Sequence, residues 1–203
     1  MLDTFHSSSN LINIFTGHNN CVNSIDYSTF DDNQFICSGS FDNTIRIWDI
    51  ETTKQLNLFK GHDNDVNSVK YGSNGLVNTI LSGSADKSVR LWDIRSGQQI
   101  LVFNGHRISV NAVEYSPFVI KNNIGNSNVI CSGSCDKTIR FWDIRSNNNE
   151  LRVMKLDDEI FCLKFMELKK KANNNEQKSN DNICVNLCYG SIKGSINVWG
   201  EHI

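Results

Sequence analysis

Short runs of alternating apolar and polar residues recur along the chain, separated by clusters of Gly, Ser, Asp and Asn. Residues 22–27 form one such run, VNSIDY, and residues 66–71 and 110–115 repeat its pattern. An alternation with a period of two and many β-branched residues is typical of a half-buried β-strand. No run shows the longer period of an extended amphipathic helix. The pattern therefore predicts an all-β protein made of short strands.

Each of these runs opens a unit in which further strands are expected. Second strands are predicted at residues 35–38, 80–82 and 130–132, third strands at 44–48, 88–92 and 138–142, and fourth strands at 55–59 and 98–103. Asp42, Asp86 and Asp136 lie in the tight turn between the second and third strands, where a short Gly/Ser/Asp cluster is expected. Each unit is therefore predicted to be four antiparallel strands.

Two dipeptides define the repeat. Gly-His begins at residues 17, 61 and 105, and Trp-Asp begins at residues 48, 92 and 142. The third unit is longer by an Asn- and Gly-rich tract at residues 121–128. A fourth, less regular copy ends at Trp199-Gly200. Repetition at intervals of this size is the signature of a repeat architecture.

Gly-His, then Ser-Gly-Ser-x-Asp, then Ile/Val-Arg-x-Trp-Asp resembles the WD-repeat (β-transducin-like) family of β-propellers. The resemblance implies an all-β propeller of four four-stranded antiparallel blades around a central channel. After a flexible N-terminus at residues 1–10, the propeller is expected to occupy 11–203, with blades at 17–60, 61–104, 105–155 and 156–203. Residues 11–15 are expected to complete the fourth blade as its outermost strand. The ring is then either closed with four blades or an open part of a larger propeller.

The resemblance also implies a buried hydrogen-bonded network in each of the first three units. It joins a loop His, a strand Ser, the turn Asp and the Trp indole: His18, Ser38, Asp42 and Trp48; His62, Ser82, Asp86 and Trp92; His106, Ser132, Asp136 and Trp142. In the fourth unit Leu156, Tyr189 and Lys193 take the His, Ser and Asp positions, so we expect a less rigid blade. The Arg residues two positions before each Trp are predicted to bond between blades: Arg46, Arg90 and Arg140.

The face formed by the Gly-His loops and Asp turns is the predicted partner-binding surface. The Asn-rich tracts at residues 121–128, 147–149 and 173–182 are expected in loops of the opposite face. The candidate contact positions lie beside the repeated signature: Cys21, Asn23, Phe41, Asp65, Asn67, Ala85, Ser109, Asn111, Cys135, Glu159, Phe161 and Ile192. Their mixture of apolar and small polar side chains suits a peptide or a loop of another protein.

The composition and charge of the chain exclude further classes of partner. The net charge of −2 and the absence of Lys/Arg clusters on the predicted face argue against nucleic acid and acidic membranes as partners. Apolar runs are too short to span a membrane. No signal peptide is recognised at the N-terminus. The 7 cysteines, without a C-x-x-C pair, indicate a reducing intracellular compartment, cytoplasm or nucleus.

Three near-identical Ser/His/Asp sets are implausible as three active sites, and no metal-ligand spacing or cofactor motif is present. We therefore expect a non-catalytic WD-repeat scaffold for protein–protein interaction, with no cofactor and no metal. The alternative is a partial propeller that works only as an assembly fragment. Such a fragment would self-associate into a homo-oligomer or pair with another propeller half.

Overall fold

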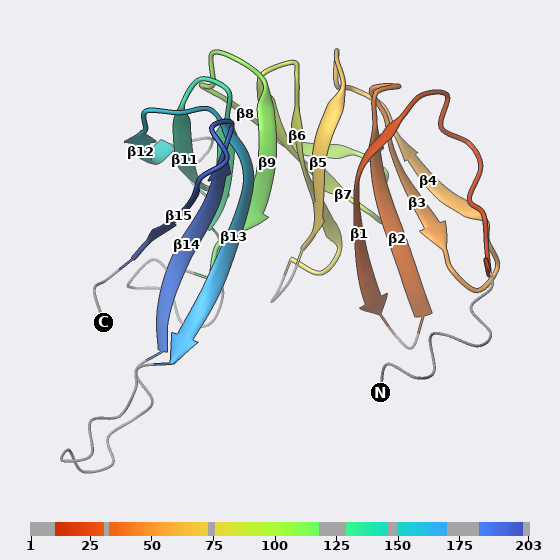
Figure 1. Cartoon of the computed structure of the whole chain (residues 1–203). Helices are drawn as coiled ribbons and strands as arrows, with labels where there is room; N and C mark the ends of the chain where they lie inside the picture. Colours follow the sequence, from red (N-terminus) through yellow and green to blue (C-terminus); the bar gives the residue numbers. More distant parts are fainter. Residues whose placement is uncertain are drawn as a thin grey trace, which may run out of the picture.

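The computed structural model describes residues 11–30, 33–72, 76–117, 129–145, 150–169 and 183–200. Within these ranges the regular structure consists of β-strands grouped into four antiparallel sheets, the blades (Figure 1). The predicted flexible N-terminus at residues 1–10 and the Asn-rich tracts at 121–128, 147–149 and 173–182 lie outside the described residues.

Within each blade, every strand pairs with the strand that precedes it in the chain. Blade one contains β1 (Val22–Phe30), β2 (Asn33–Ser40), β3 (Ile45–Asp49) and β4 (Gln55–Phe59). Blade two contains β5 (Val66–Tyr71), β6 (Thr79–Ser84), β7 (Ser88–Asp93) and β8 (Gln99–Asn104). Blade three contains β9 (Val110–Tyr115), β10 (Val129–Ser134), β11 (Thr138–Asp143) and β12 (Glu150–Lys155). Blade four contains β13 (Ile160–Lys169), β14 (Ile183–Ser191) and β15 (Ile196–Trp199).

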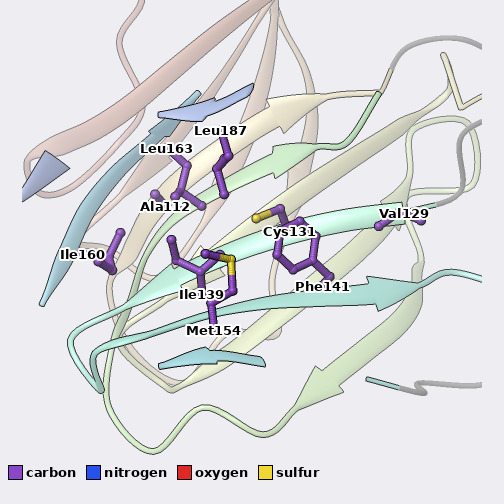
Figure 2. Packing of buried hydrophobic residues seen from close by; sticks show 9 residues of the cluster. All are labelled: Ala112, Val129, Cys131, Ile139, Phe141, Met154, Ile160, Leu163 and Leu187. Carbon is purple, nitrogen blue, oxygen red and sulfur yellow. The ribbon is translucent and has the colours of Figure 1, made fainter. Parts of the chain in front are cut away.

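The hydrophobic core is divided among the spaces between successive blades. One cluster joins blades one and two, a second joins blades two and three, and a third joins blades three and four. Figure 2 shows the third cluster, in which Ile160, Leu163 and Leu187 of blade four pack against blade three. Because both faces of a middle blade are covered in this way, every residue of β6 and β10 is buried. This burial explains why these strands read as nearly continuous small or apolar runs.

The blades are arranged around one axis as a four-bladed β-propeller, which confirms the predicted fold. The first strands β1, β5, β9 and β13 follow one another along an arc, and blades one and four stand on its two flanks (Figure 1). The structure has the expected four strands in blades one to three. In the described part of blade four, the sheet has three strands.

Residues 11–15, which were predicted to complete blade four, lie against blade one and pair with no strand among the described residues. Asn13 Nδ2 donates to the Ile50 carbonyl at 3.1 Å, and the Phe15 ring lies 5.8 Å from that of Trp48. The same kind of contact occurs one blade further on. There Asn57 Nδ2 donates to the Ile94 carbonyl of blade two at 2.6 Å, so a fourth strand also contacts the blade that follows it. Residues 11–15 keep this second contact without the sheet pairing.

Candidate functional site

The loop face, defined as the surface made by the Gly-His loops and the Asp turns, is supported by a buried hydrogen-bonded network in each of blades one to three. In blade two, His62 Nδ1 lies 2.7 Å from Asp86 Oδ2, and His62 Nε2 lies 2.7 Å from Ser82 Oγ. Trp92 Nε1 donates to the same Ser82 Oγ at 2.8 Å. One serine hydroxyl therefore connects the loop histidine with the indole on β7.

The partners determine where the protons lie. A carboxylate only accepts hydrogen bonds, so His62 Nδ1 carries the hydrogen that Asp86 accepts. In the neutral ring Nε2 is then an acceptor, and the Ser82 hydroxyl donates to it while accepting the hydrogen bond from Trp92. The Ser82 hydroxyl is fully buried and shared between the two rings, which is the arrangement of a structural network.

Blades one and three repeat this arrangement with nearly the same geometry. In blade one the His18–Asp42, His18–Ser38 and Trp48–Ser38 distances are 2.8, 2.7 and 2.8 Å. In blade three the His106–Asp136, His106–Ser132 and Trp142–Ser132 distances are 3.0, 2.8 and 2.9 Å. Three equivalent copies spread over three blades do not form one active site.

Burial and hydrogen bonding set the charge states in the network. Burial lowers the pKa of His62 and of His106 below 6.5, although the hydrogen bond to the aspartate opposes the shift in each case. Burial by itself would raise the pKa of Asp136. Hydrogen bonds from Thr138, from the backbone N–H of Arg107 and from His106 outweigh it and lower that pKa to about 2. Each of these pairs is thus a neutral imidazole beside an ionised carboxylate.

The same aspartates shape the turns of the loop face. In blade two Asp86 Oδ1 accepts hydrogen bonds from the backbone N–H and the hydroxyl of Ser88, at 2.9 and 2.7 Å. The residue between them, Lys87, has a φ of 73°, in the left-handed region that a side chain disfavours. In blade four Gly194 occupies this position with a φ of 81°. The turn shape is therefore kept even where the network is absent.

Blade four replaces the network with charged contacts. Lys193, at the Asp position, pairs with Asp158 at 2.5 Å. The Arg152 guanidinium of β12 lies 4.7 Å from the centre of the Trp199 ring, a cation–π contact with blade three. The unit whose sequence departs from the repeated signature is therefore also the blade whose turn and Trp are held by different contacts.

The arginines that recur two residues before each Trp bond within blades, so the prediction of bonds between blades is wrong. Arg90 Nη1 donates to Gln99 Oε1 at 2.7 Å, from β7 to β8 of the same blade. The corresponding pairs are Arg46–Gln55 and Arg140–Glu150, each again within one blade. The third and fourth strands are neighbours in the sheet, so a side chain on the third strand reaches the fourth before it reaches another blade.

The predicted contact positions come together as pairs, one pair in each blade. A backbone N–H in the Asp turn donates to a carbonyl in the Gly-His loop or its counterpart: Phe41 to Cys21 at 2.9 Å, Ala85 to Asp65 at 2.9 Å, Cys135 to Ser109 at 3.0 Å and Ile192 to Glu159 at 3.2 Å. These bonds hold the two loops of each blade side by side along the loop face.

The three asparagines among the predicted positions have a structural task. Asn23, Asn67 and Asn111 donate through Nδ2 to the carbonyl of Val66, Val110 and Ile160, at 3.2, 3.0 and 2.9 Å. Each bond crosses to the next blade. These side chains therefore join blades, which leaves the paired turn residues and Phe161 as the freer part of the predicted surface.

Apolar side chains are exposed on the loop face at Phe41, Phe161 and Ile192, and also at Ile108, which sequence reasoning missed. Ile108 lies in the Gly-His loop of blade three, where blades one and two carry Asn20 and Asn64. Comparing the repeats position by position would have found it, because an apolar residue replaces a polar one in an exposed loop.

The described residues contain no group of three or more His, Cys, Asp or Glu side chains placed to hold a metal ion. Burial raises the pKa of the Cys131 thiol well above its usual value, and Cys37 shows the same direction of shift, so these side chains stay neutral in the core. In the described part of the chain, no helix has the length and apolar character needed to cross a bilayer.

Sequential four-stranded sheets around one axis, with a repeated network supporting one set of loops, define a repeat-built β-propeller. The family described as "WD domain, G-beta repeat" matches residues 9–49, 53–93 and 97–143, which is more than half of the chain. The chain belongs to this WD-repeat family.

Two solved structures are similar in fold. The computationally designed Ika4 protein matches with a TM-score of 0.64 and 26% identity, over 93% of this chain and 96% of that one. The computationally designed Ika8 protein matches with the same TM-score and identity, over 91% of this chain and 47% of that one. This chain thus spans about half the length of the Ika8 chain. A search of curated protein sequences finds no significant match.

Proposed function

We propose that this protein is a non-catalytic scaffold that binds a peptide or a loop of another protein on its loop face. One observation carries the proposal: exposed apolar side chains stand on that face at turns that backbone hydrogen bonds hold beside the neighbouring loop. Phe41 and Ile192 occupy equivalent turn positions in blades one and four, and both are exposed. Side chains presented by a rigid backbone lose little conformational entropy on binding.

The chemistry of the loop face favours a partner with apolar anchors. Asp65 and Glu159 flank the apolar positions, while Arg107 and Lys137 supply the opposite charge nearby. Mixed charge around exposed apolar groups resembles the polar rim and apolar centre of protein–protein interfaces. A phosphate-rich partner would call for a cluster of basic side chains, which the predicted positions do not contain.

A selection from a random peptide library against the folded chain tests the proposal. Selected peptides should lose at least tenfold in affinity with Phe41→Glu or Ile192→Glu. They should bind Ile100→Glu normally, because Ile100 is similarly apolar and exposed but lies on the outer strand β8. Peptides that bind all three variants equally, with unchanged circular dichroism, would show that the loop face is not the binding surface.

A second candidate function, that of an assembly fragment which self-associates, is favoured by a different observation. Blades one and four expose apolar side chains whose counterparts in the other blades are buried. This candidate concerns the ends of the arc and is independent of the loop face.

A further inference from the structure

The inner strand of blade one presents an apolar face that the following blades bury. Val22 and Ile25 on β1 are 49% and 67% exposed. Their counterparts on β5, Val66 and Val69, are 0% exposed because blade one covers them. The same two side chains are therefore core residues in one blade and surface residues in another.

The far end of the arc presents the complementary face. Ile196 and Val198 on β15 are 83% and 58% exposed. Ile45 and Ile47, at the same positions of β3, are 1% and 2% exposed because blade two covers them. Blade four thus shows the surface that a following blade would cover, and blade one shows the surface of a blade that follows.

A glycine marks how closely the blades approach. A methyl group placed at Gly39 of β2 would lie 2.6 Å from Val66 and 2.9 Å from Val69, so the two branched side chains of the next blade fill the space of a missing side chain. Gly83 and Gly133 receive the first strands of blades three and four in the same manner.

Gly190 holds this position in blade four, where the described residues include no blade that packs on it. Among the described residues, only Cys162 of its own blade lies within 4 Å of a methyl group placed there. At each joint, the contact between two successive blades, the side chains that fill this space correspond to Val22 and Ile25. These are the exposed apolar residues of β1 described above.

Charges at the joints follow an alternating order. At one position of the four inner strands stand Asp26, Lys70, Glu114 and Lys164 in turn. Lys70 lies 3.9 Å from Asp26, and Lys164 lies 3.2 Å from Glu114, each pair joining two blades. If blade four is followed by a blade one, Lys164 meets Asp26, and the alternation continues without a like-charge contact.

Residues 11–15 match the fourth strand that the described part of blade four does not contain. They already contact blade one as β4 contacts blade two, and they make no sheet pairing among the described residues. In blade one, β3 pairs with β4 so that Ile45 faces Phe59 and Arg46 faces Leu58. The same register on β15 places Phe15 opposite Ile196 and Ile14 opposite Asn197.

We propose that a second copy of this chain closes the ring: blade one of each copy packs on blade four of the other, and residues 11–15 of each copy become the fourth strand of blade four in the other. The result is a two-fold symmetric ring of eight blades with two identical joints. The proposal rests on the second candidate function, self-association, and makes no use of the loop face.

Light scattering coupled to size-exclusion chromatography measures the first consequence. The particle in solution should have twice the mass of the 203-residue chain, which is 23.0 kDa. Ile25→Lys should give a folded monomer, because it buries an ammonium group at a position whose counterpart, Val69, is 0% exposed, whereas Ile100→Lys on β8 should remain a dimer. A monomeric parent chain, a larger open polymer, or a dimeric Ile25→Lys variant would overturn the proposal.

A disulfide trap measures the strand exchange itself. Ile14→Cys combined with Asn197→Cys should form a disulfide between two chains on mild oxidation. The resulting covalent dimer should separate into monomeric chains on a denaturing gel once a reductant is added. Each single variant serves as the control for the native cysteines and should not form it. A double variant that forms only an internal cross-link would show closure within one chain, and a double variant indistinguishable from the singles would show that the strand is not exchanged. An intact dimer from which no peptide dependent on Phe41 or Ile192 can be selected would count against the loop-face proposal alone.

Discussion

Removing the hydroxyl of Ser82 should destabilise the protein far more than its size suggests. Ser82 is fully buried, and its Oγ holds both His62 Nε2 and Trp92 Nε1. Ser82→Ala removes one oxygen atom, so it leaves almost no cavity. It does leave an indole N–H and an imidazole nitrogen buried without partners.

The magnitude follows from those two groups. Each buried polar group left unpaired costs about 1–3 kcal/mol, so the free energy of unfolding should fall by about 2–6 kcal/mol. For a domain of about 200 residues this corresponds to a decrease in Tm of about 4–24 °C. Ser96→Ala is the matched control, because Ser96 lies in an exposed turn of the same blade. Its effect should stay within about 0.5 kcal/mol.

Urea unfolding followed by tryptophan fluorescence gives the comparison, with all variants at one protein concentration because association adds to apparent stability. The reasoning also predicts coupling: in a Trp92→Phe background the indole N–H is already gone, so Ser82→Ala should lose about 1–3 kcal/mol less. If Ser82→Ala and Ser96→Ala unfold at the same urea concentration, the network does not stabilise the blade in the way argued here.

Three further outcomes are expected from the same structure. Lys87→Gly should raise the free energy of unfolding by about 0.5–1 kcal/mol, measured in urea, because it relieves a left-handed backbone; a decrease would contradict this. Tyr115→Phe should lower the free energy of unfolding by about 1 kcal/mol, because it removes the hydrogen bond to Thr79. Tyr71→Phe should be neutral or stabilising, because the buried Tyr71 hydroxyl has no partner among the described residues. Equal losses for the two variants in urea unfolding would refute the distinction. The pKa values of His62 and His106 are lower in the folded chain than in the unfolded chain, so the unfolded chain takes up their protons first as the pH falls. The free energy of unfolding should therefore decrease below pH 6.5, by at most about 2.7 kcal/mol per pH unit for two protons. Urea titrations at pH 7 and pH 5 that coincide would exclude this linkage.

The blades could be predicted from sequence because their internal contacts involve residue types with few substitutes. A buried indole N–H needs an acceptor, and a left-handed turn beside a strand favours an Asp that accepts its N–H groups, so Trp92 and Asp86 recur with fixed neighbours. The loop positions beside them were predicted to share one face, and in the structure Phe41 and Cys21 of that set are joined by a backbone hydrogen bond. Local chemistry and spacing were sufficient for these features.

What sequence reasoning missed depends on relations between blades. The direction in which Arg90 bonds is decided by which strand lies nearer in space. The side chain of Asn67 looks like a free loop residue in the sequence, yet it bridges to Val110 of the next blade. The position of residues 11–15 also depends on whether the two ends of the arc meet, which no local pattern encodes.

Blade four ties these points together, because the unit without the network is also the unit at the open end. In blades one to three, the turn is held from within, so it does not require the next blade. In blade four the turn relies on Lys193 and Asp158 at the surface, and Trp199 relies on Arg152 from blade three. Its three described strands lack the outer neighbour that the register of β3 and β4 would supply. A blade that draws part of its support from a neighbouring blade suits a contact between two chains, where under the proposed dimer the fourth strand and the covering face arrive together from the second copy.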